Sequence, residues 1–174
     1  VRDALYHYAA VSSDPNTQPL AAAIKASLDK LRKARGGLEQ KSEAQLLAES
    51  VVDRAEYEVD LLVRQCELEA LADVSKNRQD SRYRAAFPDG LTALISKWND
   101  EQARAIRVFR KQLDEHFAPL AKKYGKDLDQ KAQATEDAER KYIDAQTDLG
   151  QATRQLAQAK LDLMTYVNRE QRVW

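Results

Sequence analysis

The sequence predicts an all-α protein, a long antiparallel four-helix bundle whose helices pack with the heptad spacing of coiled coils. Large side chains recur every seven residues through the last third of the chain, and a series of mostly alanine is offset from them by three. Most of the five glycines and four prolines gather in a few short stretches that divide the chain into long segments. No stretch shows the sustained apolar–polar alternation of a β-strand, and the composition is typical of solvated helices.

Residues 1–12 are expected to form a short helical piece, and residues 17–35 the first long helix. The segment between them contains Pro15 and Pro19, which interrupt regular structure. The glycine pair at positions 36 and 37 is expected to separate the first long helix from the next one. The predicted inward side chains of the first long helix are Leu20, Ile24, Leu28 and Leu31.

The second long helix is expected over residues 40–80. Ser42 and Gln45 have the spacing of a capping box, in which two side chains satisfy free backbone N–H groups at the start of a helix. The helix is expected to fade between Ser75 and Arg84. Its predicted inward side chains are Leu47, Val51, Ala55, Val59, Leu62, Cys66 and Ala70.

The third long helix is expected over residues 90–117. Asp89 is a favourable N-cap residue directly before an apolar pattern. Pro119 lacks a backbone N–H and disfavours the helical conformation at Ala118, which predicts an end near Phe117. The predicted inward side chains are Leu91, Leu94, Ile95, Trp98, Gln102, Ala105, Phe109, Leu113, Phe117 and Leu120.

The last helix, expected over residues 119–172, contains the heptad pattern. Gly150 lies inside it and leaves open whether the helix is continuous, kinked or broken there, because glycine costs about 1 kcal/mol relative to alanine in a helix. Short connections favour antiparallel neighbours, and the length suggests a single domain over residues 1–174. The large series is Leu128, Thr135, Tyr142, Leu149, Leu156 and Leu163, and the offset series is Ala138, Ala145, Ala152, Ala159 and Tyr166.

The 28 basic and 28 acidic side chains balance over the whole chain but are unevenly distributed. Residues 43–73 carry nine acidic and two basic side chains. Residues 20–41 carry six basic and two acidic ones, and residues 74–111 carry nine basic and four acidic ones. The net charge of zero provides no overall field that would attract nucleic acid or an anionic membrane.

Four carboxylates of the acidic helix share one face, because they recur at spacings of four, three and four residues. The favoured interpretation is a solvated stripe that complements the basic helices beside it, where each exposed ion pair contributes about 0–1 kcal/mol. The alternative is a docking surface for a basic partner or a divalent cation. This candidate interaction stripe consists of Glu49, Asp53, Glu56 and Asp60. Its basic counterpart, interpreted as a charge partner rather than a phosphate site, consists of Lys97, Arg104, Arg107, Arg110 and Lys111.

Signatures of catalysis and of cofactor binding are missing from the sequence. Neither His7 nor His116 has a glutamate three residues before it, so the Glu-x-x-His pairs of di-iron bundles are absent. The glycine patterns of nucleotide-binding loops are absent as well. Cys66 lies on the predicted inward side, where a cysteine acts as a small apolar residue. We therefore expect no enzyme activity, no cofactor and no bound metal.

The function that the sequence favours is a non-enzymatic structural or protein–protein interaction bundle, whose partner is a second copy of the chain or another protein. The alternative is a bundle that binds lipid or a small ligand, with an apolar pocket near Trp98, Phe109 and Tyr142. Nucleic acid is not expected as a partner, and no apolar run is long enough to span a membrane. The single cysteine cannot form an internal disulfide, which slightly favours the cytoplasm.

Overall fold

The protein is an all-α helical bundle, as the sequence predicts. The computed structural model describes residues 2–13, 18–97 and 100–171, and within these residues every regular element is a helix. The elements are α1 (Arg2–Ser12), α2 (Gln18–Asp73), α3 (Ser81–Ala86), α4 (Gly90–Ile95), α5 (Asp100–His116) and α6 (Ala118–Gln171).

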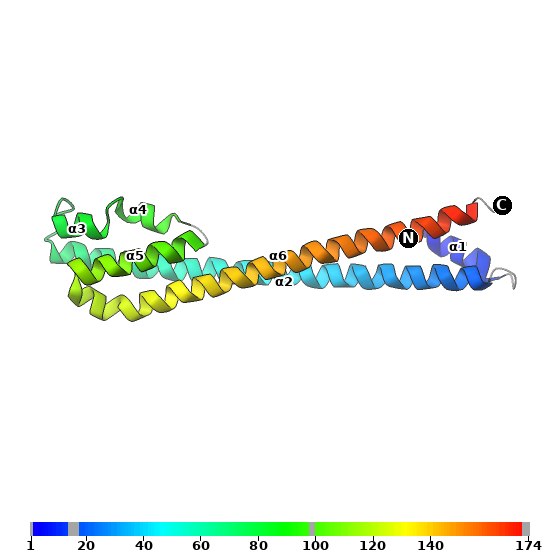
Figure 1. The fold of residues 1–174 in the computed structure, drawn as a ribbon, viewed down its shortest axis with the longest axis horizontal. Helices are drawn as coiled ribbons and strands as arrows, with labels where there is room; N and C mark the ends of the chain where they lie inside the picture. Colours follow the sequence, from blue (N-terminus) through cyan, green and yellow to red (C-terminus); the bar gives the residue numbers. More distant parts are fainter. Residues whose placement is uncertain (1, 14–17, 98–99, 172–174) are drawn as a thin grey trace. The chain divides into compact units, whose positions relative to one another are not determined.

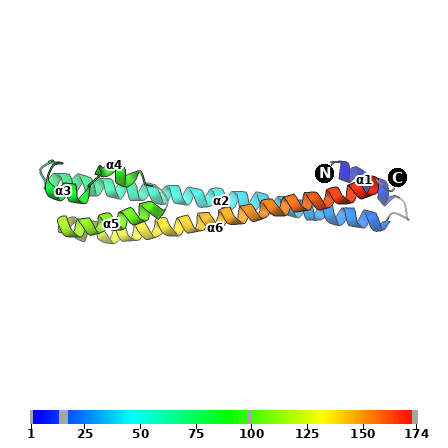
Figure 2. The same ribbon diagram turned by 45° about the horizontal axis from the view of Figure 1, so that its top comes forward.

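The chain forms two compact units, the first consisting of Val1–Gln45 and Ala145–Trp174 and the second of Leu46–Asp144. Helices α2 and α6 contribute to both units, and α1 belongs to the first unit, where it lies beside these two helices (Figures 1 and 2). An ion pair of 2.6 Å between Lys41 Nζ and Asp148 Oδ2 also joins α2 to α6 in this unit. The buried core of the first unit consists of Val11, Ala21, Ile24, Leu28, Leu31, Ala159 and Leu163.

The second unit packs parts of α2 and α6 together with α3, α4 and α5. Helix α5 lies along α6, and the short helices α3 and α4 pack on α5 (Figure 1). Lys123 on α6 pairs with Glu69 on α2, and Lys131 pairs with Glu58, so residue numbers rise along α6 as they fall along α2. These two helices are therefore antiparallel. The largest fully buried side chains of this unit include Phe109, Ile106, Leu113, Leu128, Val59 and Val63.

Helix α6 confirms the predicted last helix over residues 119–171, and Arg172 lies outside the described residues. Leu128, Thr135 and Leu163 of the large series are buried, as are Ala138, Ala152 and Ala159 of the offset series. Tyr166 is exposed, and the half-buried members of the two series are Tyr142, Ala145, Leu149 and Leu156. Helix α6 runs through Gly150 without a break. The end of the preceding helix is also confirmed, because α5 stops at His116.

The glycine pair does not separate two helices, and the prediction of separate helices over 17–35 and 40–80 is wrong. Helix α2 is continuous from Gln18 to Asp73, so Ser42 and Gln45 lie inside it and do not begin it. A break would leave four backbone N–H groups and four C=O groups without helical partners on its two sides. Two glycines cost only about 1 kcal/mol each inside a helix, which makes continuity the cheaper solution.

The prediction that α2 extends to residue 80 is also wrong, because the helix ends at Asp73. Ser75 and Lys76 adopt left-handed backbone conformations, and the Lys76 N–H donates to the carbonyl of Leu71 at 2.6 Å. The donor lies five residues after the acceptor, and a hydrogen bond of this kind is typical of a C-terminal helix cap.

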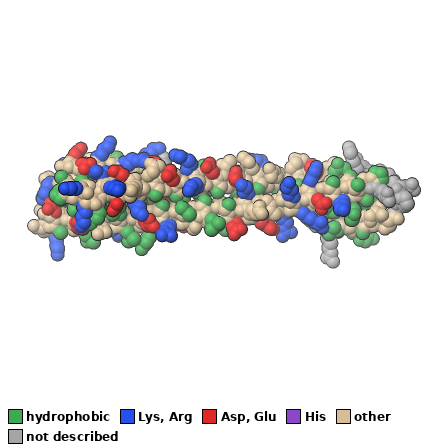
Figure 3. Space-filling view, turned by 90° about the horizontal axis from the view of Figure 1, so that it is seen from below, with side chains coloured by type: hydrophobic (Ala, Val, Ile, Leu, Met, Phe, Trp, Pro, Cys, Tyr) green, Lys and Arg blue, Asp and Glu red, His purple; other side chains and the backbone are tan. Residues whose placement is uncertain are grey.

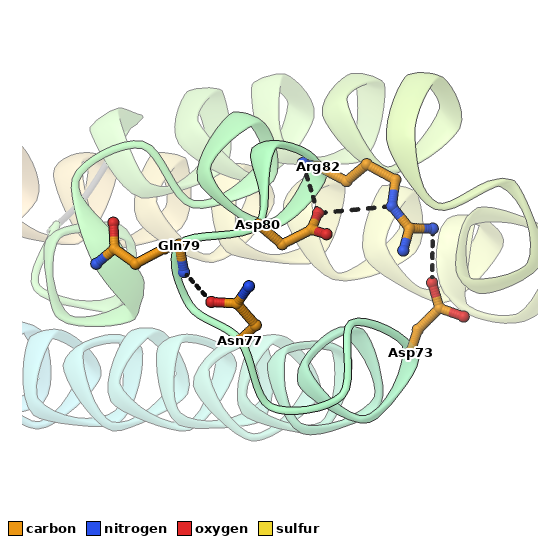
Figure 4. Close-up of polar contacts among 5 residues, drawn as sticks. All are labelled: Asp73, Asn77, Gln79, Asp80 and Arg82. Atoms are coloured by element: carbon orange, nitrogen blue, oxygen red, sulfur yellow. Dashed lines mark hydrogen bonds and ion pairs between the residues drawn. The ribbon is translucent and has the colours of Figure 1, made fainter.

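Side-chain contacts then lead the chain from this turn into α3 (Figure 4). Asn77 Oδ1 accepts a hydrogen bond from the Gln79 N–H, and Asp80 Oδ1 accepts one from the Arg82 N–H at the start of α3. The Arg82 guanidinium reaches back to Asp73 at 3.0 Å. The turn is thereby joined to the helices on both of its sides.

The single helix expected over residues 90–117 is instead two helices, α4 and α5. Trp98 lies outside the described residues. Helix α4 packs on α5. Leu91, Leu94 and Ile95 thereby pack against the same buried cluster as Phe109.

The inward placement of Leu47 and Val51 is wrong as well, because their exposed fractions are 62% and 52%. Val52 is buried in the core instead, and its side chain points about 100° away from that of Val51 around the helix. Val59, Cys66 and Ala70 are buried as predicted. Since α2 has large apolar side chains on two sides, its periodicity alone does not say which side packs inside the chain.

Candidate interaction surface

An exposed apolar face runs along the part of α2 that belongs to the second unit. At about 100° per residue, its side chains fall within an arc of about 140° around the helix. Their exposed fractions range from 49% for Leu61 to 66% for Leu68. We call this set the apolar face, and it consists of Leu46, Leu47, Val51, Tyr57, Leu61 and Leu68.

The apolar face lies opposite the side of α2 that packs in the core. Val59, Val63 and Cys66 are almost fully buried against the other helices of the second unit. A helix that is apolar on both sides is typical of an element covered on both sides. Contiguous exposed apolar patches are uncommon on monomeric proteins and usually mark interaction sites. The apolar face therefore needs a cover that the chain itself does not supply within the described residues.

Two residues of the heptad that underlies the apolar face are charged. The positions that follow Leu47 and Val51 in a heptad pattern are Arg54 and Glu58. Arg54 Nε lies 3.0 Å from Glu58 Oε1, and Glu58 also pairs with Lys131 of α6. Lys131 and, to a smaller degree, Arg54 lower the pKa of Glu58. One basic and one acidic group thus lie together in the middle of the strip, which also includes the polar Gln65.

The four carboxylates of the predicted stripe have different surroundings. Glu49 and Asp53 are exposed, whereas Glu56 and Asp60 are half-buried. Asp60 Oδ1 accepts a hydrogen bond of 3.2 Å from Gln102 Nε2 on α5, so its side chain is engaged inside the second unit. Burial raises the pKa of Asp60, and the charge of Arg64 partly opposes this shift. Asp53 borders the apolar face, about 40° around the helix from Tyr57.

Two residues of the basic counterpart, both on α5, pair with residues of α5 and α6. Arg107 Nη2 donates to Glu136 Oε2 at 2.7 Å, and Arg110 pairs with Asp114 and with Asp129 at 3.8 Å. Lys97, Arg104 and Lys111 are exposed. On the face of the molecule that Figure 3 shows, side chains of both signs are interspersed with hydrophobic ones.

A buried carboxylate that the sequence analysis missed lies at the end of α2. Glu67 is 5% exposed, and its Oε1 accepts hydrogen bonds from Tyr83 Oη at 2.8 Å and from Arg78 Nη2 at 3.2 Å. Burial, together with the bond to Glu67, raises the pKa of Tyr83 to about 12. The tyrosine therefore stays a hydrogen-bond donor at neutral pH, and the cluster fastens α3 to α2. The inward pattern does not mark Glu67, because its side chain points about 100° away from that of Cys66 around the helix.

A cavity of about 660 Å³ lies between the α3–α4 segment and α5. Its apolar walls include Phe87, Leu94 and Phe109, and Lys97 also lines it. Of the residues predicted to form a pocket, Phe109 lines this cavity, Tyr142 does not, and Trp98 lies outside the described residues. The volume is within the range of small-molecule sites.

The described residues offer little that resembles a catalytic or metal site. No group of three histidine, cysteine, aspartate or glutamate side chains among them is placed to hold a metal ion. Cys66 is fully buried, and burial raises the pKa of its thiol to about 12, so it is protonated at neutral pH. None of the described helices combines the length and the apolar character that a membrane span needs.

No protein-family model matches this chain, and comparisons with curated proteins and with solved structures returned no match. Its function therefore has to be inferred from the geometry of the chain itself.

Proposed function

We propose that this protein is a non-enzymatic interaction module that binds a protein helix through the apolar face of α2. The observation that carries the proposal is the exposure of six large apolar side chains on one side of one helix, in a stretch of 23 residues from Leu46 to Leu68. Burying such side chains is the main driving force of protein association.

The way in which α2 is held supports this role. Its opposite side is packed in the core of the second unit, and ion pairs to Lys123 and Lys131 tie it to α6. A surface that is already ordered loses little conformational entropy on binding. The apolar face is therefore prepared for a partner without a folding step.

A membrane surface fits the apolar face less well than a protein does. Helices that lie on bilayers combine their apolar side with a polar side rich in lysine and arginine. The polar residues of α2 between positions 43 and 73 are mostly acidic, which repels anionic lipid.

Site-specific photo-crosslinking in the cells that naturally make the protein tests the proposal. We expect a photoreactive amino acid at Leu61 or Leu68 to give adducts with a protein, either a second copy or a different one. The matched control is the same amino acid at Lys111, an exposed position on α5 that lies outside the apolar face, where we expect no such adduct. Absence of protein adducts at both face positions would contradict the proposal.

The cavity beside α5 supports a second candidate function, the binding of a small apolar ligand. Ala105 lines this cavity, so Ala105→Phe should fill part of it. We expect an apolar fluorescent dye to bind the unmodified protein and to bind this variant at least about tenfold more weakly, since it loses several buried contacts. Equal binding to both proteins would remove the second candidate.

A further inference from the structure

We propose that the partner of the apolar face is a second copy of this chain, whose α2 lies antiparallel to the first across a two-fold axis near residue 56. This inference rests on the proposed function, because it names the occupant of the same surface. Three features of α2 point to it: the heptad spacing of the face, the arrangement of its residues about the midpoint, and the position of the charged pair.

The exposed strip follows the spacing of a coiled-coil seam. Leu47, Leu61 and Leu68 are separated by multiples of seven residues, and Val51 occupies the alternate position four residues after Leu47. The remaining seam positions are Arg54, Glu58 and Gln65. A seam of this kind accepts another helix of the same kind. Its length from Leu47 to Leu68, 21 steps of 1.5 Å, is about 32 Å.

The seam is self-complementary when a second copy is turned end for end. In an antiparallel pair, a residue of the series that contains Arg54 and Leu61 faces a residue of the series that contains Val51 and Glu58 in the second copy. With the two-fold axis near residue 56, the numbers of two facing residues add up to 112. Val51 then faces Leu61 of the second copy, and Leu61 faces its Val51. Two apolar layers therefore lie symmetrically on either side of the centre, as a two-fold interface requires.

The same register brings opposite charges together at the centre. Arg54, which is exposed, faces Glu58 of the second copy, and the two-fold axis repeats this pair on the other side. In a parallel pair, by contrast, Arg54 would face Arg54 and Glu58 would face Glu58. A polar pair within an apolar seam is the usual device that fixes the direction and register of paired helices. The charges that interrupt the apolar face thus select the antiparallel pair.

Crosslinking of cysteine variants tests the geometry directly. Tyr57 lies near the proposed axis, so a short bifunctional maleimide should join two copies of the Tyr57→Cys variant. Leu68 lies 12 residues from the axis, which places its two copies about 36 Å apart. The Leu68→Cys variant should therefore stay uncrosslinked, although Leu68 is equally exposed. Crosslinking of both variants would indicate a parallel pair and overturn the proposal, as would crosslinking of neither.

Sedimentation at several concentrations measures the dimer itself. We expect a particle of twice the 19.7 kDa chain mass. The Leu61→Glu variant should raise the dissociation constant of the dimer by at least about tenfold. The matched control is Leu161→Glu, which changes an exposed leucine of α6 in the first unit and should leave the dimer intact. A strictly monomeric protein would overturn the proposal. If photo-crosslinking then captures a different protein at Leu61, the proposed function stands and only the identity of the partner is wrong.

Mixing two charge variants tests the central pair. Arg54→Glu places four carboxylates at the centre of a dimer with itself, where only the two copies of Lys131 oppose them, and Glu58→Arg places four arginines there beside the same two lysines. Each variant alone should be monomeric, whereas an equimolar mixture should form a heterodimer, because every acidic group then faces a basic one. Circular dichroism of each variant verifies that it is folded. Failure of the folded variants to pair in the mixture would overturn the proposed register.

Discussion

Lys76 adopts a backbone conformation that its own side chain disfavours. Its φ angle is 63°, in the left-handed region, where the Cβ atom of an L-residue approaches the backbone too closely. The conformation is needed because the Lys76 N–H closes the end of α2 on the carbonyl of Leu71. Glycine adopts this conformation without the steric cost.

We therefore expect Lys76→Gly to raise the free energy of unfolding by about 1 kcal/mol. Urea denaturation followed by circular dichroism measures the change. Lys76→Ala keeps a Cβ atom and serves as the control, for which we expect no gain. An equal gain in both variants would show that the lysine side chain, and not the backbone, is responsible.

Asp60 and Gln102 form a contact in which one group is left unsatisfied. Gln102 Nε2 donates to Asp60, but the buried Oε1 of Gln102 has no hydrogen-bond partner among the described residues. Burial disfavours the charged form of Asp60 and raises its pKa. An asparagine at position 60 would remove the charge and offer an N–H group to the free oxygen.

Asp60→Asn is accordingly expected to raise the free energy of unfolding at pH 7 by about 1 kcal/mol. The gain should shrink as the pH falls through the raised pKa of Asp60, because the protonated carboxyl of the unmodified protein is also neutral. Denaturation at a series of pH values measures both effects. The exposed Asp53→Asn is the control and should change stability by less than about 0.5 kcal/mol.

Among the helices, α2 passes through Gly36 and Gly37 with open space around both positions. A Cβ atom at either one would have no neighbouring atom within 4 Å. At Gly125 of α6, by contrast, a Cβ atom would collide with the Arg110 guanidinium, which forms ion pairs across α5 and α6. An alanine substitution should therefore have different outcomes at these sites.

We expect Gly36→Ala and Gly37→Ala to stabilise the protein by about 1 kcal/mol each, because alanine loses less backbone entropy in a helix. Gly125→Ala should give no gain, since the benefit to the helix is offset by displacement of Arg110. Thermal unfolding followed at 222 nm compares the three variants. A loss of stability in Gly36→Ala would mean that the glycine pair does not lie in a regular helix.

Sequence patterns predicted α6 well and α2 less well, for a physical reason. The large and small series of α6 differ in size, and only one side of that helix is consistently apolar. Helix α2 has two apolar sides, and the pattern predicts Val51 as inward although the packing of the other helices buries Val52. The glycine pair does not break the helix, because the cost of about 1 kcal/mol for each glycine is smaller than the cost of two open helix ends.

The candidate site was predicted only in part. Asp53 lies beside the apolar face, but the four-carboxylate pattern gave no information on Leu61 or Leu68. Their exposure depends on which side of α2 the rest of the second unit covers, and this is a tertiary property. Glu67 was missed because its partners, Tyr83 and Arg78, are brought to it only by the turn after α2.

Over the whole molecule, the charges that balance in the sequence also pair between helices of the second unit. Lys131, Lys123 and Arg107 lower the pKa values of three glutamates, which are Glu58, Glu69 and Glu136. A carboxylate whose pKa is lowered by folding stabilises the folded state above its unfolded pKa, and this contribution is lost as the pH falls through the folded pKa.

We therefore expect these three glutamates to leave the melting temperature unchanged between pH 7 and pH 5. Below about pH 4.5 their protonation should lower the stability progressively. Thermal unfolding across this range measures the effect. Replacing all three glutamates by glutamine should flatten the acid limb of the curve, whereas the exposed Glu43→Gln should not. An unchanged acid limb in the triple variant would assign acid sensitivity to other groups.

The alkylation rate of Cys66 reports how often the core of the second unit opens. It is the only cysteine of the chain, it is fully buried beside the core of the second unit, and its thiol is protonated at neutral pH. An alkylating reagent can reach it only when that core opens, so the labelling rate reports the frequency of opening without any introduced probe. If two copies pair along α2, the labelling rate of Cys66 should fall as the protein concentration rises. In the Leu61→Glu variant the labelling rate should not depend on protein concentration.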